Sequence, residues 1–171
     1  MKEYRSLALT IIAIFIITFM AAYYSTSFEA QQNYLSLFIL LGVMLFIFSV
    51  LVVFALLGFK SFAIFLALLL GLVLEAYGPL GAFFVTAITY FIWGSVFVME
   101  LLLFQNGSEG AKEWFLERYA FQTFKIEYYS FYPLMGFLYL ILEVIPHLFS
   151  QETLVKFSPK EVFEKMKLLL K

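Results

Sequence analysis

The stretch that decides the fold runs from Lys60 to Phe104 and reads KSFAIFLALLLGLVLEAYGPLGAFFVTAITYFIWGSVFVMELLLF. Two long apolar runs meet in it at Gly78-Pro79, and Glu75 is the only charge deep in the first run. Apolar runs of about 20 residues are typical of helices that cross a lipid bilayer, and a Gly-Pro pair favours a turn. The stretch therefore predicts a transmembrane helical hairpin with its corner at Gly78-Pro79.

The composition of the whole chain is that of a membrane protein. Of its 171 residues, 64% are hydrophobic and 13% are charged, and the mean hydropathy is +0.96. Soluble domains carry about 25% charged residues, so much of this chain is expected to face membrane lipids. A membrane β-barrel would instead show short segments of alternating hydrophobicity. We therefore expect an all-α fold, a polytopic integral membrane helical bundle in the cell membrane.

The residue types that are absent exclude several kinds of site. The chain has no cysteine, which excludes disulfides, thiolate metal sites, iron–sulfur clusters and cysteine catalysis. Its one histidine, His147, excludes a haem held by two histidines of this chain. A net charge of −1 gives no basic surface for nucleic acid. We expect no cofactor and no metal, and an enzyme is the least expected class because no activated nucleophile is evident.

Four apolar segments are each near the length of a membrane span. They cover about residues 7–24, 34–59, 62–77 and 80–104. The first is longer than the apolar core of a secretory signal, which has about 7–15 residues, so it is expected to be retained as a helix.

The remainder of the chain is more mixed. Residues 109–129 combine charges with aromatic side chains, which favours a helix or loop at the membrane interface. Residues 130–149 are apolar again but contain Pro133, Glu143 and Pro146. This fifth segment is expected either to span the membrane or to enter it and return, as a broken segment buried in protein does. Four or five transmembrane helices are thus predicted.

The positions of the basic residues predict the orientation. The links at 25–33 and 78–79 contain no Lys or Arg, whereas Lys60 and the basic residues of 112–125 lie in the other links. Cytoplasmic loops carry the excess of Lys and Arg, so the N-terminus is expected in the cytoplasm. A full crossing by 130–149 would carry the lysines of the C-terminal tail outside, whereas a re-entrant segment would keep them inside. Both topologies stay open.

Residues 158–171 predict a C-terminal amphipathic helix. Ser158 and Glu161 form a capping box, with Pro159 at the first helical position. At about 100° per residue, one side of the helix is apolar and the opposite side carries the charges. The apolar side consists of Val162, Phe163, Met166, Leu169 and Leu170. Such a helix is expected to lie on a membrane surface or on a partner protein.

Small residues recur along both arms of the hairpin at helical spacing. The stripe in the first arm continues into an acidic residue, and the stripe in the second arm is interrupted by Tyr90. Small side chains let helix backbones approach one another in lipid. The stripes are therefore predicted to form a helix-packing face, within the hairpin or toward a partner. They consist of Ala63, Ala67, Gly71 and Glu75, and of Gly78, Ala82, Thr86 and Gly94.

Three carboxylates lie in or near the apolar runs. Glu75 and Glu100 are near opposite ends of the hairpin arms, where each side chain is expected to reach the membrane edge. Glu143 lies deeper, and His147 follows four residues later on the same helical face. These two form a candidate intramembrane polar site. Pro146 lies between them and further ligands are missing, so neither a metal nor a catalytic role is expected there.

The corner of the hairpin combines Gly71, Glu75, Tyr77-Gly78-Pro79, Leu80-Gly81 and Tyr90. This combination resembles the signature region of MreD-type rod-shape-determining membrane proteins. The family has a Gly-rich helix running into G-x-x-x-D, a short turn, a Leu-Gly pair, and then an aliphatic helix with a Tyr. The chain departs from the family by Glu75 in place of Asp and by a shorter corner. The resemblance implies a non-catalytic membrane scaffold that joins a periplasmic coiled-coil partner and cytoskeletal filaments to wall-synthesis enzymes.

These observations lead to one favoured function and two alternatives. The favoured one is a non-enzymatic integral membrane subunit or scaffold of a larger complex that contains other membrane protein subunits. MreD also resembles the substrate-binding subunits of vitamin transporters, so a small-molecule carrier subunit is the first alternative. It predicts a closed cavity lined by Glu75, Thr86, Tyr90 and Trp93. An accessory subunit of a respiratory or proton-moving complex is the second.

Overall fold

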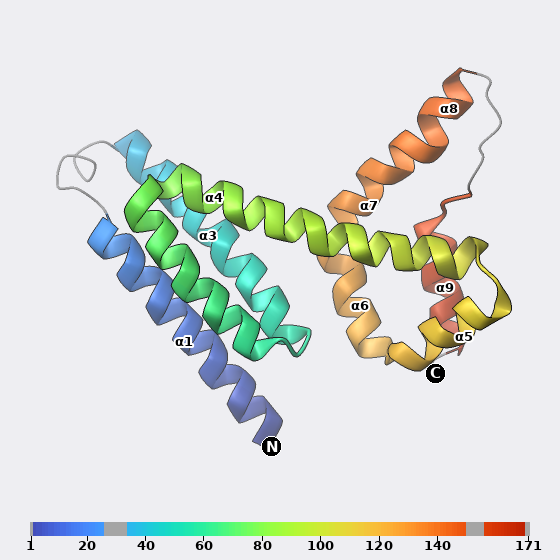
Figure 1. Ribbon diagram of the computed structural model, residues 1–171, viewed down its shortest axis with the longest axis horizontal. Helices are drawn as coiled ribbons and strands as arrows, with labels where there is room; N and C mark the ends of the chain where they lie inside the picture. Colours follow the sequence, from blue (N-terminus) through green and yellow to red (C-terminus); the bar gives the residue numbers. More distant parts are fainter. Residues whose placement is uncertain (1, 26–33, 150–155, 170–171) are drawn as a thin grey trace. The chain divides into compact units, whose positions relative to one another are not determined.

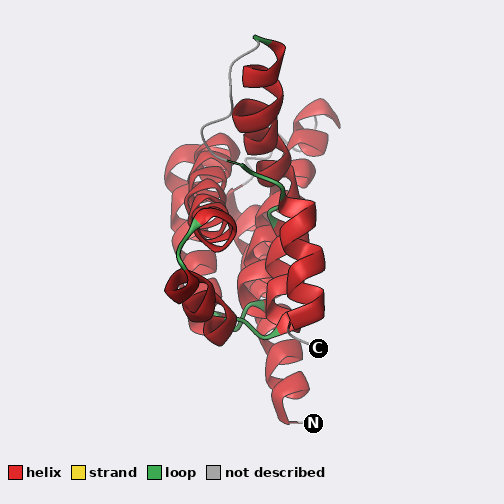
Figure 2. Cartoon of the chain, turned by 90° about the vertical axis from the view of Figure 1, so that its right-hand side faces the viewer, coloured by secondary structure: helices red, strands yellow, loops and turns green. Residues whose placement is uncertain are grey.

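The computed structural model describes residues 2–25, 34–149 and 156–169. Every element in these ranges is a helix, and Figure 2 draws no strand among them. The all-α class is thus confirmed. In chain order (Figure 1) the elements are α1 (Lys2–Ser25), α3 (Tyr34–Leu56), α4 (Lys60–Asn106), α5 (Glu109–Arg118), α6 (Phe121–Ser130), α7 (Tyr132–Tyr139), the π-helix η1 (Leu140–Val144), α8 (Ile145–Leu148) and α9 (Pro159–Leu169).

Three of the described helices are long and apolar enough to cross a membrane. They contain the stretches Tyr4–Ala22, Phe38–Leu56 and Lys60–Asn106, and α6 with the helical run from Tyr132 to Leu148 makes a fourth if this pair, bent by 66°, is one span. The 47 residues of α4 would extend about 70 Å as a straight helix, against a hydrocarbon core of about 30 Å. A break at Gly78 divides α4 into two arms, which correspond to the predicted spans 62–77 and 80–104.

The chain forms two compact units, residues 1–90 and 91–171, with the boundary inside the second arm of α4. In the first unit, α1 and α3 lie side by side and the first arm of α4 packs on them (Figure 1). Phe54 of α3 makes an edge-on contact with Phe62 of α4, at 5.2 Å between ring centroids. A Cβ atom added to Gly71 of α4 would lie 3.5 Å from the Cβ of Ala21 in α1. The small residue at position 71 therefore lets α4 approach α1 closely.

The corner of the hairpin depends on one glycine. Gly78 has φ of +71° and ψ of −174°, a conformation open essentially to glycine alone, and the chain turns back there (Figure 1). Pro79 starts the second arm, where its missing N–H and fixed φ are tolerated. A Cβ atom on Gly81 would lie 2.5 Å from the Cβ of Tyr77, so the backbone is also close-packed one turn later.

Replacing Gly78 by alanine is expected to lower the free energy of unfolding by about 1–3 kcal/mol, because alanine is strained at this φ and ψ. Thermal unfolding of the detergent-purified protein, followed by circular dichroism, measures the loss. Gly42→Ala is the matched control, since an added Cβ on this exposed α3 position meets nothing within 4 Å. Equal unfolding temperatures for the two variants would contradict the positive φ at the corner.

The second unit is built around a cluster of aromatic rings. Phe124 of α6 lies at its centre, and its ring centroid is about 6 Å from those of Phe97, Phe115 and Phe163. Phe115 and Phe124 have no exposed surface. The cluster therefore joins α4, α5, α6 and α9 into one core.

Residues 109–129 form two helices, α5 and most of α6, rather than one continuous element. α5 ends at Arg118, and the extended backbone at Tyr119 and Ala120 separates it from α6. This break explains why the apolar positions of the segment follow no single stripe. Trp114 is exposed, whereas most of the other aromatic side chains point into the core of the unit. Whether the segment lies at a membrane interface stays a prediction.

The apolar segment 130–149 is also broken. Phe131 separates α6 from α7, and η1 follows at Leu140–Val144. Pro146 has no N–H to donate to the preceding helical turn, and the Ile145 N–H bonds the Leu140 carbonyl in the wider π pattern. The π-helix is therefore a local response to Pro146. The choice between a full span and a re-entrant segment stays open.

The C-terminal amphipathic helix packs on its own chain, which corrects part of the prediction. α9 begins at Pro159, as expected, but its apolar side is covered by α6. Val162 and Met166 are buried, and the Phe163 ring lies 4.6 Å from that of Tyr128. Leu169 remains exposed, and position 170 lies outside the described residues. The apolar side of α9 is thus buried largely against α6 of the same unit.

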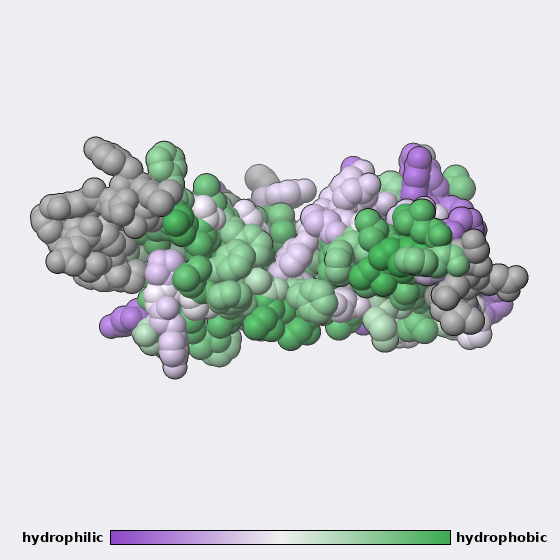
Figure 3. Space-filling view, turned by 90° about the horizontal axis from the view of Figure 1, so that it is seen from above, coloured by the Kyte–Doolittle hydropathy of each residue, from purple (hydrophilic) through white to green (hydrophobic). Residues whose placement is uncertain are grey.

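Large apolar side chains also lie on the outside of the described helices. Hydrophobic residues, drawn in green, make up much of the face in view in Figure 3. On α1, Leu9 is 67% exposed and Phe19 is 61% exposed. On α3, Phe38 and Leu45 are 72% and 66% exposed. Such surfaces favour a surrounding of lipid or of other apolar helices.

Candidate functional site

The two small-residue stripes are mostly buried within the chain. Ala63, Ala67 and Ala82 are at most 3% exposed. Gly94 is buried against α7, where an added Cβ would lie 2.5 Å from Leu134 Cδ2 and 2.9 Å from Phe131 Cδ1. Two members do not belong to this packing face: Glu75 is exposed, and Gly78 is half-buried, with nothing within 4 Å of an added Cβ atom. The contacts described for these stripes are thus made by helices of the same chain.

The residues expected to line a carrier cavity do not share one environment. Thr86 has no exposed surface, and its hydroxyl donates to the Ala82 carbonyl at 2.8 Å. A side chain that water cannot touch does not line a water-sized cavity. Glu75 is exposed, whereas the Tyr90 ring lies 6.5 Å from that of Phe46. Trp93 follows Tyr90 by three residues on α4 and is half-buried.

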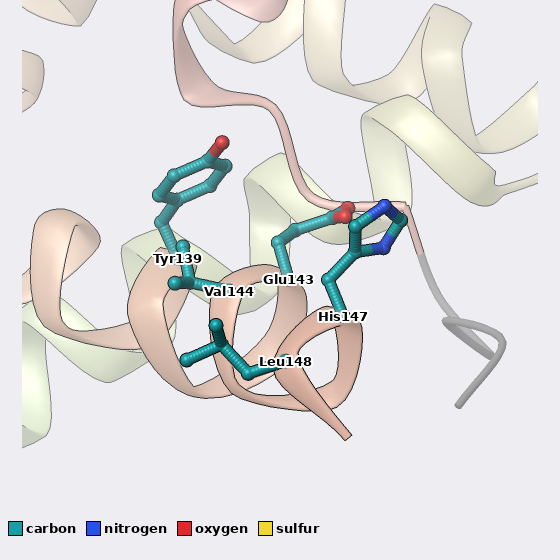
Figure 4. Close-up of a pocket in the computed structure, with 5 residues that line it drawn as sticks. All are labelled: Tyr139, Glu143, Val144, His147 and Leu148. Atoms are coloured by element: carbon teal, nitrogen blue, oxygen red, sulfur yellow. The ribbon is translucent and has the colours of Figure 1, made fainter. Parts of the chain in front are cut away.

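Glu143 and His147 border an open pocket of about 380 Å³ on one side of the η1–α8 segment. Figure 4 shows both side chains projecting to the same side of the helix. The pocket is completed by Tyr139, Val144 and Leu148. Glu143 has a structural partner: its Oε1 atom accepts a hydrogen bond of 2.6 Å from the backbone N–H of Phe157.

Two further hydrogen bonds link the segment 156–158 to the end of α4. Gln105 Oε1 accepts from the Ser158 N–H at 2.9 Å, and Asn106 Nδ2 donates to the Lys156 carbonyl at 2.8 Å. The Phe157 side chain between them is fully buried. Glu143 therefore helps to fix the start of α9, in addition to bordering the pocket.

Replacing Glu143 by alanine is expected to loosen the tail. The part-buried Phe157 N–H would lose its acceptor, which costs about 1–3 kcal/mol. A free-energy change of about 1.4 kcal/mol alters an equilibrium constant tenfold. The opening of residues 156–169, and with it their hydrogen exchange, should therefore accelerate at least several-fold. His147→Ala borders the same pocket and is the control, with unchanged exchange expected. If His147→Ala loosened the tail as much as Glu143→Ala, the hydrogen bond would not be the cause.

A polar cluster in the second unit, with Glu100 and Tyr119 buried, is the most distinctive site of the described chain. Glu100 of α4 has a side chain only 8% exposed, and it forms an ion pair of 3.2 Å with Nη2 of Arg118 at the end of α5. The Tyr119 hydroxyl lies 2.5 Å from Glu100 Oε2 and 2.7 Å from Glu127 Oε2 of α6. We call Glu100, Arg118, Tyr119 and Glu127 the carboxylate–tyrosine cluster. It joins three helices through polar contacts next to the aromatic core.

The electrostatics of the cluster keep the tyrosine protonated. Burial raises the pKa of Tyr119 above its usual value, and the neighbouring Glu127 and Glu100 carboxyl groups raise it further. The Arg118 guanidinium also lies over the Trp114 ring, at 5.3 Å from its centroid. The ring and the carboxylate together fix the position of the guanidinium.

The cluster corrects the expectation for Glu100. The sequence placed this residue near the end of a span, where its carboxylate was expected to reach the membrane edge. Instead it turns inward, because Arg118 and Tyr119 provide partners for a buried carboxylate. Glu100 precedes the other three cluster residues by 18 to 27 positions, with two helix breaks between, so no fixed spacing in the sequence connects them. The nearby charges and tyrosine in 109–129 were the only sequence signal.

Among the described residues, no group of three or more acidic or histidine side chains could hold a metal ion. Comparison with known proteins finds no matching family model, no matching curated protein and no matching solved structure. The resemblance of residues 71–90 to MreD-type proteins therefore stays a prediction.

Proposed function

We propose that the chain is an integral membrane protein in which α1, α3 and both arms of α4 cross the bilayer, with the N-terminus in the cytoplasm. The support is the exposed apolar surface of these helices, on which side chains such as Leu9, Phe19 and Phe38 are more than half exposed. Burying apolar surface is worth about 25 cal/mol per Å², so water is an unfavourable environment for these faces.

Extraction of cell membranes at alkaline pH tests the membrane assignment. An integral protein stays with the membrane pellet, whereas release into the supernatant would overturn the assignment. Protease treatment of sealed vesicles then separates the two topologies. Cleavage near Lys160 only from the cytoplasmic side supports a re-entrant 130–149 segment, and cleavage only from the outside supports a fifth crossing.

We further propose that the protein works as a non-enzymatic subunit or scaffold of a larger membrane assembly, as MreD-type proteins do in cell-shape and wall-synthesis machinery. One observation supports this function above others: polar side chains that the sequence offered as candidate functional groups form hydrogen bonds within the fold. Glu143 bonds the Phe157 amide and Thr86 bonds its own helix. The exposed apolar faces of α1 and α3 remain as surfaces that other membrane helices could cover.

Purification from native membranes in mild detergent tests the subunit function. The expected result is a partner of constant stoichiometry, identified by mass spectrometry. Wall-synthesis or cytoskeletal partners would support the MreD-like assignment, whereas subunits of a respiratory or proton-moving complex would support that alternative. A stable monomer without partners across several mild detergents would overturn the scaffold function.

A further inference from the structure

The two oxygen–oxygen contacts in the carboxylate–tyrosine cluster need two hydrogens, whereas a neutral tyrosine beside two ionised carboxylates provides one. Two carboxyl oxygens, Glu100 Oε2 and Glu127 Oε2, lie within hydrogen-bond distance of the Tyr119 hydroxyl oxygen. A neutral tyrosine carries one hydroxyl hydrogen, and an ionised carboxylate only accepts. With both carboxylates ionised, one of these two contacts would bring two oxygens together with no hydrogen between them.

The position of Arg118 indicates where the extra proton lies. Its guanidinium pairs with Glu100 at 3.2 Å, and a positive partner favours the ionised form of a carboxyl group. Glu127 is therefore the better carrier. We propose that at neutral pH Glu127 holds a proton and donates it in a hydrogen bond to Tyr119, whose own hydroxyl donates to the Glu100 carboxylate, and that the four residues form a proton-binding site.

This arrangement also defines a route for the proton. The Glu127 O–H bond breaks as Tyr119 receives that proton, and the original tyrosine hydrogen forms a new O–H bond with Glu100. The tyrosine is neutral before and after, so the net result is transfer of one proton from α6 to α4. The charged and titratable groups that face Glu127 in the cluster are Glu100, Arg118 and Tyr119.

Proton binding makes the stability of the second unit depend on pH. In the unfolded chain a glutamate is ionised at neutral pH, so the folded protein would bind more protons than the unfolded one. Stability then falls as the pH rises through neutrality, since loss of the proton leaves two negative carboxylates around one hydroxyl. Proton binding at the cluster needs no partner protein and is therefore independent of the proposed subunit function.

Infrared difference spectroscopy of the full chain in detergent micelles tests the site directly. At neutral pH, the wild-type protein should show the C=O stretch of a protonated carboxylic acid, and Glu127→Gln should lose this band. Glu117→Gln, on an exposed position of α5, should retain it. No protonated band in the wild type would overturn the proposal. A band that persists in Glu127→Gln would overturn the placement of the proton on Glu127.

Thermal unfolding gives a second readout in case the infrared bands overlap. Between about pH 5 and 8, the unfolding temperature of the wild-type chain should fall as the pH rises. The Glu127→Gln amide can still donate to Tyr119 but cannot titrate, so its profile should be flatter. An identical pH dependence in both proteins would contradict the proposal.

Discussion

Replacing Phe124 by alanine is expected to lower the free energy of unfolding of the second unit by about 3–5 kcal/mol. The side chain is fully buried and lies among rings from three other helices, α4, α5 and α9. Alanine would leave a cavity at the point where these helices meet. The rings around it are held by the backbones of separate helices, so the cavity cannot close by a small movement of one side chain.

Tryptophan fluorescence is the measurement that isolates this effect. Both tryptophans of the chain, Trp93 and Trp114, belong to the second unit. Their unfolding transition in detergent therefore reports the unit that contains Phe124. Phe137→Ala is the matched control, because this phenylalanine of α7 is 56% exposed and its truncation leaves no cavity. Similar losses in the two variants would contradict the central position of Phe124.

Replacing Gly94 by leucine is expected to cost about 3 kcal/mol or more. Even the first added carbon would lie 2.5 Å from Leu134 and 2.9 Å from Phe131, and leucine adds three carbons beyond it. Overpacking of this kind typically costs about 1–3 kcal/mol when the structure can adjust. Here Phe131 is itself part of the aromatic core, so room for the larger side chain is limited by Phe97, whose ring centroid lies 5.9 Å from that of Phe131.

The same substitution at Gly136 is the control for Gly94→Leu. Gly136 lies on α7 of the same unit, and a Cβ atom added there meets nothing within 4 Å. Leucine at this position should be neutral or stabilising by up to about 1 kcal/mol, because it favours a helix more than glycine does. Unfolding curves for Gly94→Leu that match those for Gly136→Leu would show that α4 and α7 do not pack closely at Gly94.

Features with a local cause were predictable from the sequence. The corner at Gly78 follows from a glycine and a proline between two apolar runs, and the start of α9 at Pro159 follows from its capping pattern. The close packing at Gly71 and Gly94 follows from small side chains at helical spacing. In each case, neighbours within a few residues carry the information.

Features with a distant cause needed the tertiary structure. The sequence showed that Glu143 and His147 share a helical face, but the partner of Glu143 is a backbone N–H 14 residues later. Likewise, the amphipathic pattern of α9 indicated that one face must be covered, while only the structure identified α6 as the surface that covers it.

The sequence alone determined that the chain is helical, that several of its segments are long and apolar enough to cross a membrane, and that the central hairpin turns at Gly78. These properties depend on side-chain polarity and on backbone conformations that one residue can set. Only the tertiary structure brought Glu100, Tyr119 and Glu127 together, because a buried carboxylate takes its partners from whatever helices pack around it. Contacts of that kind depend on how two breaks in the chain, at Ser108 and at Tyr119, direct the helices that follow.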